Sequence, residues 1–153
     1  MLFIIEGPDG SGKTSLAETL SKQTGYPIVH RSQPKSEEEK AKMFDEYLRL
    51  ASSSKNVILD RCWYSEMVYG PVMRDASVLS YPDMYKLEAA AKKHGAIVIY
   101  CTDQPGVLWK RCKRRGEDYI VDASTYNAIY EGYEELMRSV PHLIPVVCYG
   151  FSD

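Results

Sequence analysis

Short apolar runs alternate with longer amphipathic segments along the chain. The apolar runs have the length of strands and lie at residues 2–5, 28–30, 57–59, 96–101 and 146–149. The segments with helical spacing of apolar residues are 11–23, 37–51, 82–94, 106–115 and 124–139. Continuous apolar strands are buried on both faces, which is typical of a parallel sheet covered by helices. The pattern therefore predicts an α/β three-layer sandwich, with a five-stranded parallel sheet and helices on both faces.

A glycine-rich segment follows the first predicted strand and opens the first predicted helix. Residues 7–14 read GPDGSGKT and match the P-loop pattern GxxxxGK[ST]. In such a loop, backbone N–H groups surround a β-phosphate, Lys13 reaches the β- and γ-phosphate oxygens, and Thr14 offers its hydroxyl to Mg²⁺. The strand before it and the helix after it favour a P-loop over a plain turn. The expected ATP-binding residues are Gly7, Gly10, Ser11, Gly12, Lys13, Thr14 and Ser15.

A carboxylate closes the third predicted strand. Three apolar residues, 57–59, precede Asp60, and this pattern places a carboxylate beside the metal ion in P-loop enzymes. Alone, such an aspartate is more often a helix cap. Together with the P-loop it indicates a metal ligand, so Thr14 and Asp60 are the expected Mg²⁺ ligands.

A basic segment favours a kinase among the P-loop classes. The chain has no NKxD motif, and the acid that ends the third predicted strand does not begin a DxxG motif, because residues 60–63 read DRCW; neither sign of a GTPase is therefore present. Residues 110–115 read KRCKRR. A kinase needs positive charge on a segment that closes over the phosphoryl group in transit. At 100° per residue, Arg111, Arg114 and Arg115 share one side of a helix. A solvated helix end is the competing interpretation. We expect a lid at about residues 110–122, with these arginines as catalytic candidates.

Taken in order, these motifs resemble the thymidylate kinase family across almost the whole chain. Residues 3–14, FIIEGPDGSGKT, are similar to the opening of that family, and residues 60–70 resemble its DRY segment with the downstream serine and tyrosine. The later strand, the arginine-rich lid and residues 133–136 follow in the family's order. The fourth position of the P-loop is Gly10 and not arginine, and in this the chain resembles the branch of the family that supplies catalytic arginines from the lid. The chain thus looks like a short, phage-type member.

The resemblance implies a reaction and further roles. It implies phosphoryl transfer from ATP and Mg²⁺ to dTMP or a related pyrimidine deoxynucleoside monophosphate. Asp9 would hold the nucleotide sugar and Arg61 would grip the acceptor phosphate. Residues 30–34 echo the family's REPG loop, which adds Arg31 to the acceptor side. Tyr69 and Arg74 lie in the stretch that the family places beside the acceptor. The catalytic set is therefore Asp9, Lys13, Asp60, Arg61, Arg111, Arg114 and Arg115.

Departures from that family leave two alternatives open. Only one predicted helix, 37–51, separates the second strand from Asp60, and Cys62 stands in place of the DRY tyrosine. A shallow acceptor pocket suits a kinase for a hydroxyl, either of a nucleoside or of 5-hydroxymethyluracil in phage DNA, with Asp9 or Asp60 as the base. The other alternative is a non-catalytic NTP-binding subunit, against which the intact P-loop, Asp60 and Arg61 argue.

Composition limits the partners. The chain has 153 residues, 44% hydrophobic and 26% charged, which predicts one domain over residues 1–153. A net charge of −2 predicts a small-molecule nucleotide substrate, with nucleic acid only under the DNA alternative. Four scattered cysteines without a CxxC pair favour a reduced, cytoplasmic protein. The first apolar run is too short for a signal peptide or a membrane span, so no membrane partner is expected. A homodimer is compatible with the sequence.

Overall fold

Five parallel strands form one sheet in the computed structural model, which describes residues 1–115 and 122–150. The strands are β1 (Leu2–Glu6), β2 (Ile28–His30), β3 (Val57–Asp60), β4 (Ala96–Thr102) and β5 (Val146–Gly150). Their order is β2-β3-β1-β4-β5, and every neighbouring pair is parallel. The central strand β1 carries Ile4 and Ile5, both wholly buried. The parallel sheet predicted from the apolar runs is confirmed.

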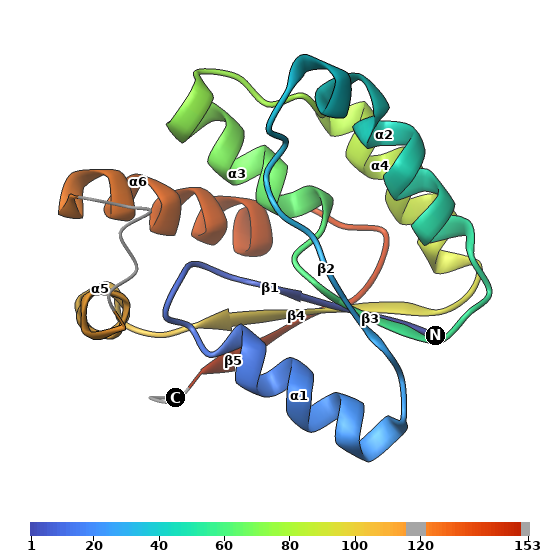
Figure 1. The fold of residues 1–153 in the computed structure, drawn as a ribbon, viewed down its shortest axis with the longest axis horizontal. Coiled ribbons are helices and arrows are strands. Elements are labelled where there is room, and N and C mark those ends of the chain that lie inside the picture. The colour runs from blue at the N-terminus through green and yellow to red at the C-terminus, as the bar shows by residue number, and fades with distance from the viewer. Residues whose placement is uncertain (116–121, 151–153) are drawn as a thin grey trace.

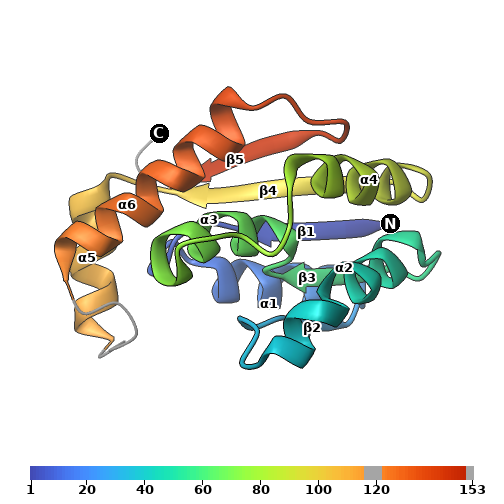
Figure 2. The ribbon, with the colours of Figure 1, turned by 90° about the horizontal axis from the view of Figure 1, so that it is seen from above.

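Helices cover the two faces of the sheet unequally (Figures 1 and 2). On one face lies α1 (Lys13–Thr24), packed on a small cluster that includes Ile5 and Ile58. The opposite face and its larger core are covered by α2 (Glu37–Ser52), α3 (Trp63–Arg74), α4 (Tyr81–Lys92) and α6 (Ala123–Glu134). The three-layer sandwich is therefore confirmed. In residues 1–115 and 122–150, no helix has the length and apolar character needed to cross a bilayer.

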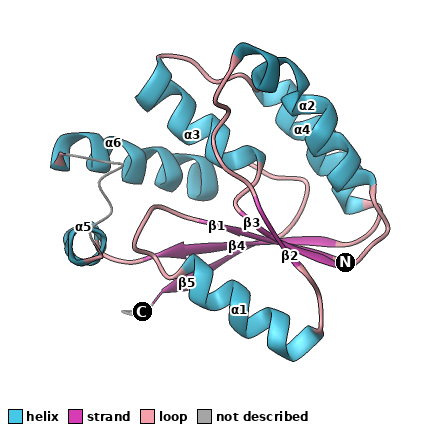
Figure 3. Ribbon diagram, viewed as in Figure 1, coloured by secondary structure: helices cyan, strands magenta, loops and turns pink. Residues whose placement is uncertain are grey.

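The carboxyl ends of the strands point toward α5 (Pro105–Arg114), which Figure 3 shows end-on and Figure 2 shows running across that end of the sheet. There the chain leaves β1 for α1 and leaves β3 for α3. Ligands of open parallel sheets bind at this end. After α6, the chain continues as a π-helical turn, η1 (Glu135–Ser139), before it enters β5.

Helix α3 is the element that the hydrophobic pattern missed. Its C-terminal half contains Gly70 and Pro71, which interrupt the usual helical signals. Gly70 is required by packing, because a Cβ there would lie 2.5 Å from Glu66 Oε2 and 2.8 Å from the Ala76 carbonyl oxygen. The other helices were predicted to within about two residues at most ends. The exception is the predicted helix over 124–139, which becomes π-helical from Glu135.

A buried ion pair ties the segment before β5 to α4. His142 Nδ1 lies 2.6 Å from Glu88 Oε2, and the side chains are 5% and 0% exposed. The same carboxylate accepts hydrogen bonds from the Tyr64 hydroxyl and, at 2.9 Å, from the Leu143 amide. Burial alone lowers the pKa of His142, but the hydrogen bonds to Glu88 and to the Leu136 carbonyl outweigh burial and raise it.

This pair predicts a pH-dependent stability. Because the folded-state pKa of His142 is raised, its stabilising contribution is complete below the unfolded value, about 6.5, and is lost as the pH rises through the folded value. We expect the free energy of unfolding, measured by urea denaturation, to fall over this range. The variant His142→Gln keeps a side chain that forms hydrogen bonds but cannot titrate, so its profile should be flatter. Equal slopes for the two proteins would contradict the assignment.

Candidate active site

A cavity of about 670 Å³ opens at the carboxyl ends of β1, β2 and β3. One wall is the P-loop, another is the loop 31–35 that follows β2, and a third is the start of α3. Ten of the residues predicted for the site line it: Asp9, Gly10, Gly12, Lys13, Thr14, Arg31, Asp60, Arg61, Tyr69 and the lid candidate Arg115. Donor and acceptor groups predicted from separate parts of the sequence thus face one space.

The P-loop glycines are dictated by its conformation and by α5. Gly10 has a φ of +83°, which disfavours any residue with a Cβ. A Cβ at this position would also lie 2.7 Å from the Leu108 carbonyl oxygen and 3.3 Å from the Cys112 nitrogen. The backbone of α5 therefore rests against the loop. This contact leaves no room for an arginine at position 10.

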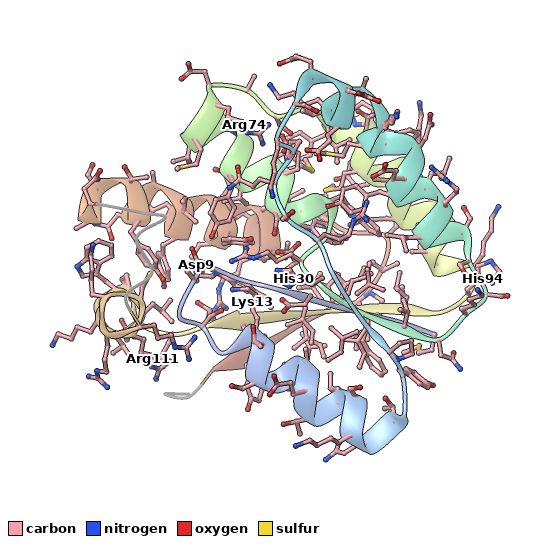
Figure 4. The ribbon with its side chains drawn as sticks, viewed as in Figure 1. Asp9, Lys13, His30, Arg74, His94 and Arg111 are labelled. Carbon is pink, nitrogen blue, oxygen red and sulfur yellow. The ribbon has the colours of Figure 1, made fainter. Side chains whose placement is uncertain are left out.

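Lys13 is buried beside the cavity. It is 7% exposed, and its Nζ donates to the Pro8 carbonyl at 2.9 Å. Burial, and then the positive charge of Arg61, lower the pKa of Lys13 to about 8, against the opposing effect of Asp9, Glu6 and Asp60. A buried ammonium of this kind gains stability from an anionic ligand. In Figure 4 its side chain lies close to that of Asp9, at the mouth of the P-loop.

Asp60 and Thr14 provide oxygen atoms that fit a magnesium ion. The Thr14 hydroxyl donates to Asp60 Oδ2 at 3.4 Å, and His30 Nδ1 lies 3.2 Å from the same oxygen. The other carboxylate oxygen, Oδ1, is buried without a hydrogen-bond partner among the described residues. Mg²⁺ takes few protein ligands and fills its shell with water and phosphate oxygens. Within residues 1–115 and 122–150, no cluster of three or more histidine, cysteine or acidic side chains suits a metal ion.

Arg61 stands at the centre of a hydrogen-bond network. It follows β3 with a φ of 72°, which is uncommon for a residue with a side chain. Its guanidinium forms an ion pair with Asp9, and its Nη1 donates to Ser65 Oγ at 3.4 Å and to Tyr133 Oη at 3.3 Å. The guanidinium also lies 5.2 Å from the centre of the Tyr69 ring. Burial would lower the pKa of Arg61, but its tyrosine and carboxylate neighbours raise it, so the charge is retained.

The other predicted arginines differ in whether they line the cavity. Arg31 lines the cavity, pairs with Glu46 at 2.8 Å and lies 5.4 Å from the Tyr47 ring centre. Arg74, in the last turn of α3 (Figure 4), pairs with Glu66 and does not itself line the cavity. Arg111 lies 3.3 Å from Asp103, and neither it nor Arg114 lines the cavity.

Residues 116–121 of the predicted lid lie outside the described residues. Arg115 is thus the lid candidate that the structure places at the cavity.

Several residues at the cavity were not found from the sequence. Met43 and Tyr47 of α2 line it, and their spacing of four residues puts them on one face of the helix. Glu66 also lines it, one turn of helix after Cys62. Helical spacing of this kind is also typical of ordinary core residues, so it did not mark these three residues as part of a binding site.

The fold and the site together define a P-loop NTPase that is structurally similar to nucleoside kinases. Its defining features are the strand order, the loop from residue 7 to residue 14, and the carboxylate at the end of β3. Within this class, the chain belongs to the YorR family. It is 37% identical over 141 residues to the SPbeta prophage-derived uncharacterized protein YorR of Bacillus subtilis (strain 168), covering 90% of this chain and 82% of that protein.

Solved structures agree with this assignment. The crystal structure of Bacillus subtilis YorR in complex with phosphorylated GDP superposes with a TM-score of 0.82 and 30% identity, covering 98% of this chain and 85% of that one. Deoxyadenosine kinase from M. mycoides shares the fold, with a TM-score of 0.68 and 19% identity over 98% of this chain and 91% of that one. The model of the AAA family, ATPase family associated with various cellular activities, matches residues 3–60.

Proposed function

We propose that the chain is an ATP-dependent kinase that transfers a phosphoryl group to a nucleoside-type acceptor. The observation that carries the proposal is that Lys13, Asp60 and Arg61 line the same cavity. A P-loop alone serves hydrolases and kinases alike. An arginine in the turn between β3 and α3, outside the P-loop sequence but paired with its Asp9, supports binding of a second substrate. The nucleotide complex of the YorR relative also supports nucleotide binding in this family.

The residues of the site divide the work of transfer between them. The P-loop amides and Lys13 bind the donor phosphates. Thr14 and Asp60 would hold Mg²⁺, which would supply charge neutralisation at the phosphate oxygens. Arg61 orients the acceptor, and Asp9 holds the guanidinium at the P-loop. Positioning and electrostatic stabilisation carry most of phosphoryl transfer, so no strong nucleophilic side chain is needed.

For the acceptor, the resemblance to thymidylate kinases favours dTMP or a related pyrimidine monophosphate. Tyr69 and Tyr47 supply aromatic surfaces to the cavity on which a base can stack. A phosphate acceptor is already a nucleophile at neutral pH, so this reaction requires no general base.

A hydroxyl acceptor is the second candidate, and the ion pairs of the site favour it. The arginines predicted for the acceptor side each pair with a carboxylate: Arg31 with Glu46 and Arg61 with Asp9 at the cavity, and Arg74 with Glu66, although Arg74 itself does not line the cavity. A phosphate dianion would have to compete with these carboxylates, whereas a neutral hydroxyl would not. Asp9 beside Arg61 could then accept the hydroxyl proton. A nucleoside or 5-hydroxymethyluracil in DNA fits this chemistry.

A panel of acceptors separates the candidates. Labelled ATP, and GTP because of the guanine nucleotide in the YorR complex, are incubated with dTMP, other monophosphates, thymidine and an oligonucleotide containing 5-hydroxymethyluracil. Label on dTMP supports the first candidate, and label only on thymidine or the modified oligonucleotide supports the second. If no species gains label under conditions where the nucleotide binds, the kinase proposal is wrong and the non-catalytic alternative remains.

The lid arginines should differ in their effects. Arg115 lines the cavity and Arg114 does not, so we expect Arg115→Ala to lose about 2–4 kcal/mol of transition-state stabilisation, the scale of one electrostatic donor. Arg114→Ala is the matched control and should stay within about threefold of wild-type turnover. Steady-state kinetics on the acceptor found in the panel measure both. If alanine at each of positions 111, 114 and 115 left turnover near the wild-type value, residues 110–115 would be a solvated helix end and not a catalytic lid.

A further inference from the structure

Glu6 does not line the cavity, but it contacts two residues that do. It ends β1, directly before the P-loop, and is 0% exposed. Its Oε1 accepts from the backbone amides of Cys62 at 2.8 Å and Ser65 at 3.1 Å. Both amides lie at the start of α3, where helix N–H groups have no partner four residues back in the helix, although the Ser65 amide also donates to the Cys62 carbonyl at 3.1 Å. Glu6 therefore caps α3 from a neighbouring strand.

The second carboxylate oxygen binds two hydroxyls. Oε2 accepts from Ser65 Oγ at 2.7 Å and from Tyr133 Oη at 3.0 Å. Because both hydroxyls donate to the carboxylate, their lone pairs are available to accept from other groups. These are the same two oxygens that receive Nη1 of Arg61, at 3.4 and 3.3 Å. The direction of each hydrogen bond thus runs from Arg61 to the hydroxyls and from the hydroxyls to Glu6.

Tyr133 reaches this place through close packing of two helices. It belongs to α6 and is 0% exposed. The preceding residue, Gly132, lets α6 approach α3, because a Cβ there would lie 3.1 Å from a Val68 side-chain carbon. Tyr133 also stacks on Tyr100 of β4, with ring centres 6.1 Å apart. The hydroxyl that receives Arg61 is therefore held by packing on two sides.

We propose that Glu6 is a positioning residue of the acceptor subsite, which orients the hydroxyls of Ser65 and Tyr133 so that they hold the Arg61 guanidinium beside the P-loop. It acts on the acceptor through Arg61 and touches no reacting atom. Its kinetic consequences rest on the proposed kinase function, but its structural consequence does not. Replacing the carboxylate by an amide keeps the shape and reverses the direction in which the hydroxyls must bond.

The test compares two variants with two matched controls. Glu6→Gln and Tyr133→Phe disturb the hydrogen bonds to Arg61. Glu88→Gln removes another carboxylate that is 0% exposed and binds Tyr64 and His142 away from the cavity. Tyr100→Phe removes the hydroxyl of the neighbouring buried tyrosine, which donates to Glu134 at 2.9 Å. Each control makes the same chemical change, and neither the Glu88 carboxylate nor the Tyr100 hydroxyl is hydrogen-bonded to Arg61 or to the hydroxyls that hold it.

Kinetics and structure give separate readouts. With dTMP and thymidine as probes, we expect Glu6→Gln and Tyr133→Phe to raise the acceptor KM about tenfold and the ATP KM less than about threefold, as for one lost hydrogen bond to a charged group. The controls should leave both values near wild type. Equal acceptor KM values in variants and controls, or a proportional rise in both KM values, would overturn the proposal.

Crystal structures of wild type and Glu6→Gln decide the matter without catalysis. In Glu6→Gln we expect the Arg61 guanidinium to lose its hydrogen bonds to the hydroxyls of Ser65 and Tyr133, while the P-loop backbone keeps its wild-type conformation. An unmoved guanidinium would overturn the proposal. A wild type that labels no acceptor would refute the kinase function, while this structural comparison would still decide the role of Glu6.

Discussion

The variant Lys13→Met is expected to lose phosphoryl transfer by about 10³-fold and to remain folded. Lys13 lines the cavity, and it is the one lysine in the P-loop, residues 7–14. Its burial disfavours the charged form in the absence of a ligand, as its lowered pKa shows. Methionine has a similar length and carries no charge. The free energy of unfolding should therefore be unchanged or higher, while kcat falls.

Single-turnover transfer and urea denaturation on the same preparations separate the two effects. Lys22→Met is a suitable control, since Lys22 lies in the last turn of the same helix, α1, outside the cavity lining. Near-wild-type turnover of Lys13→Met would refute the P-loop assignment. Loss of activity together with loss of folding would show that Lys13 is a structural residue.

The variant Arg61→Ala should lower kcat/KM for the acceptor by about 10²-fold or more. Truncating one partner of a buried, hydrogen-bonded charge pair costs several kcal/mol, because the remaining charge loses its counterion. Here the remaining charge is Asp9, in the P-loop. We expect a higher acceptor KM and a lower kcat, with the KM for ATP changed much less.

Arg138→Ala provides the comparison for Arg61. Arg138 pairs with Glu134 and lies 5.8 Å from the Tyr100 ring centre, so it resembles Arg61 in its contacts but lies outside the cavity lining. Its replacement should leave both KM values unchanged. An equal rise of the ATP and acceptor KM values in Arg61→Ala would move Arg61 to the donor side of the site.

The fold was predictable because each strand is a short, uninterrupted apolar run. Residues 2–5 and 57–59 have no polar alternation, and in the structure Ile4, Ile58 and Leu59 are wholly buried. The pattern missed α3 because Gly70 and Pro71 mimic a turn. In the structure, the close approach of Glu66 and of the loop after α3 leaves no room for a Cβ at position 70, and this packing reason for the glycine cannot be read from the sequence.

The site was predictable where chemistry follows directly from position along the chain. The P-loop and Asp60 end neighbouring strands, so a parallel sheet brings them to the same edge. Glu6 and Tyr133 could not be found in this way. Their meeting requires β1, α3 and α6 to pack together, across 127 positions of sequence separation. Likewise, the sequence does not show which carboxylates pair with the arginines, and the hypothesis of a hydroxyl acceptor depends on these ion pairs.

The fate of the γ-phosphate decides whether this protein is a kinase. In a single turnover with γ-labelled ATP, Mg²⁺ and the acceptor found in the panel, we expect the label to appear on the acceptor, with little inorganic phosphate, and we expect Lys13→Met and Arg61→Ala both to suppress this transfer. Label released only as inorganic phosphate, at a rate independent of acceptor, would instead show that the protein is an ATPase.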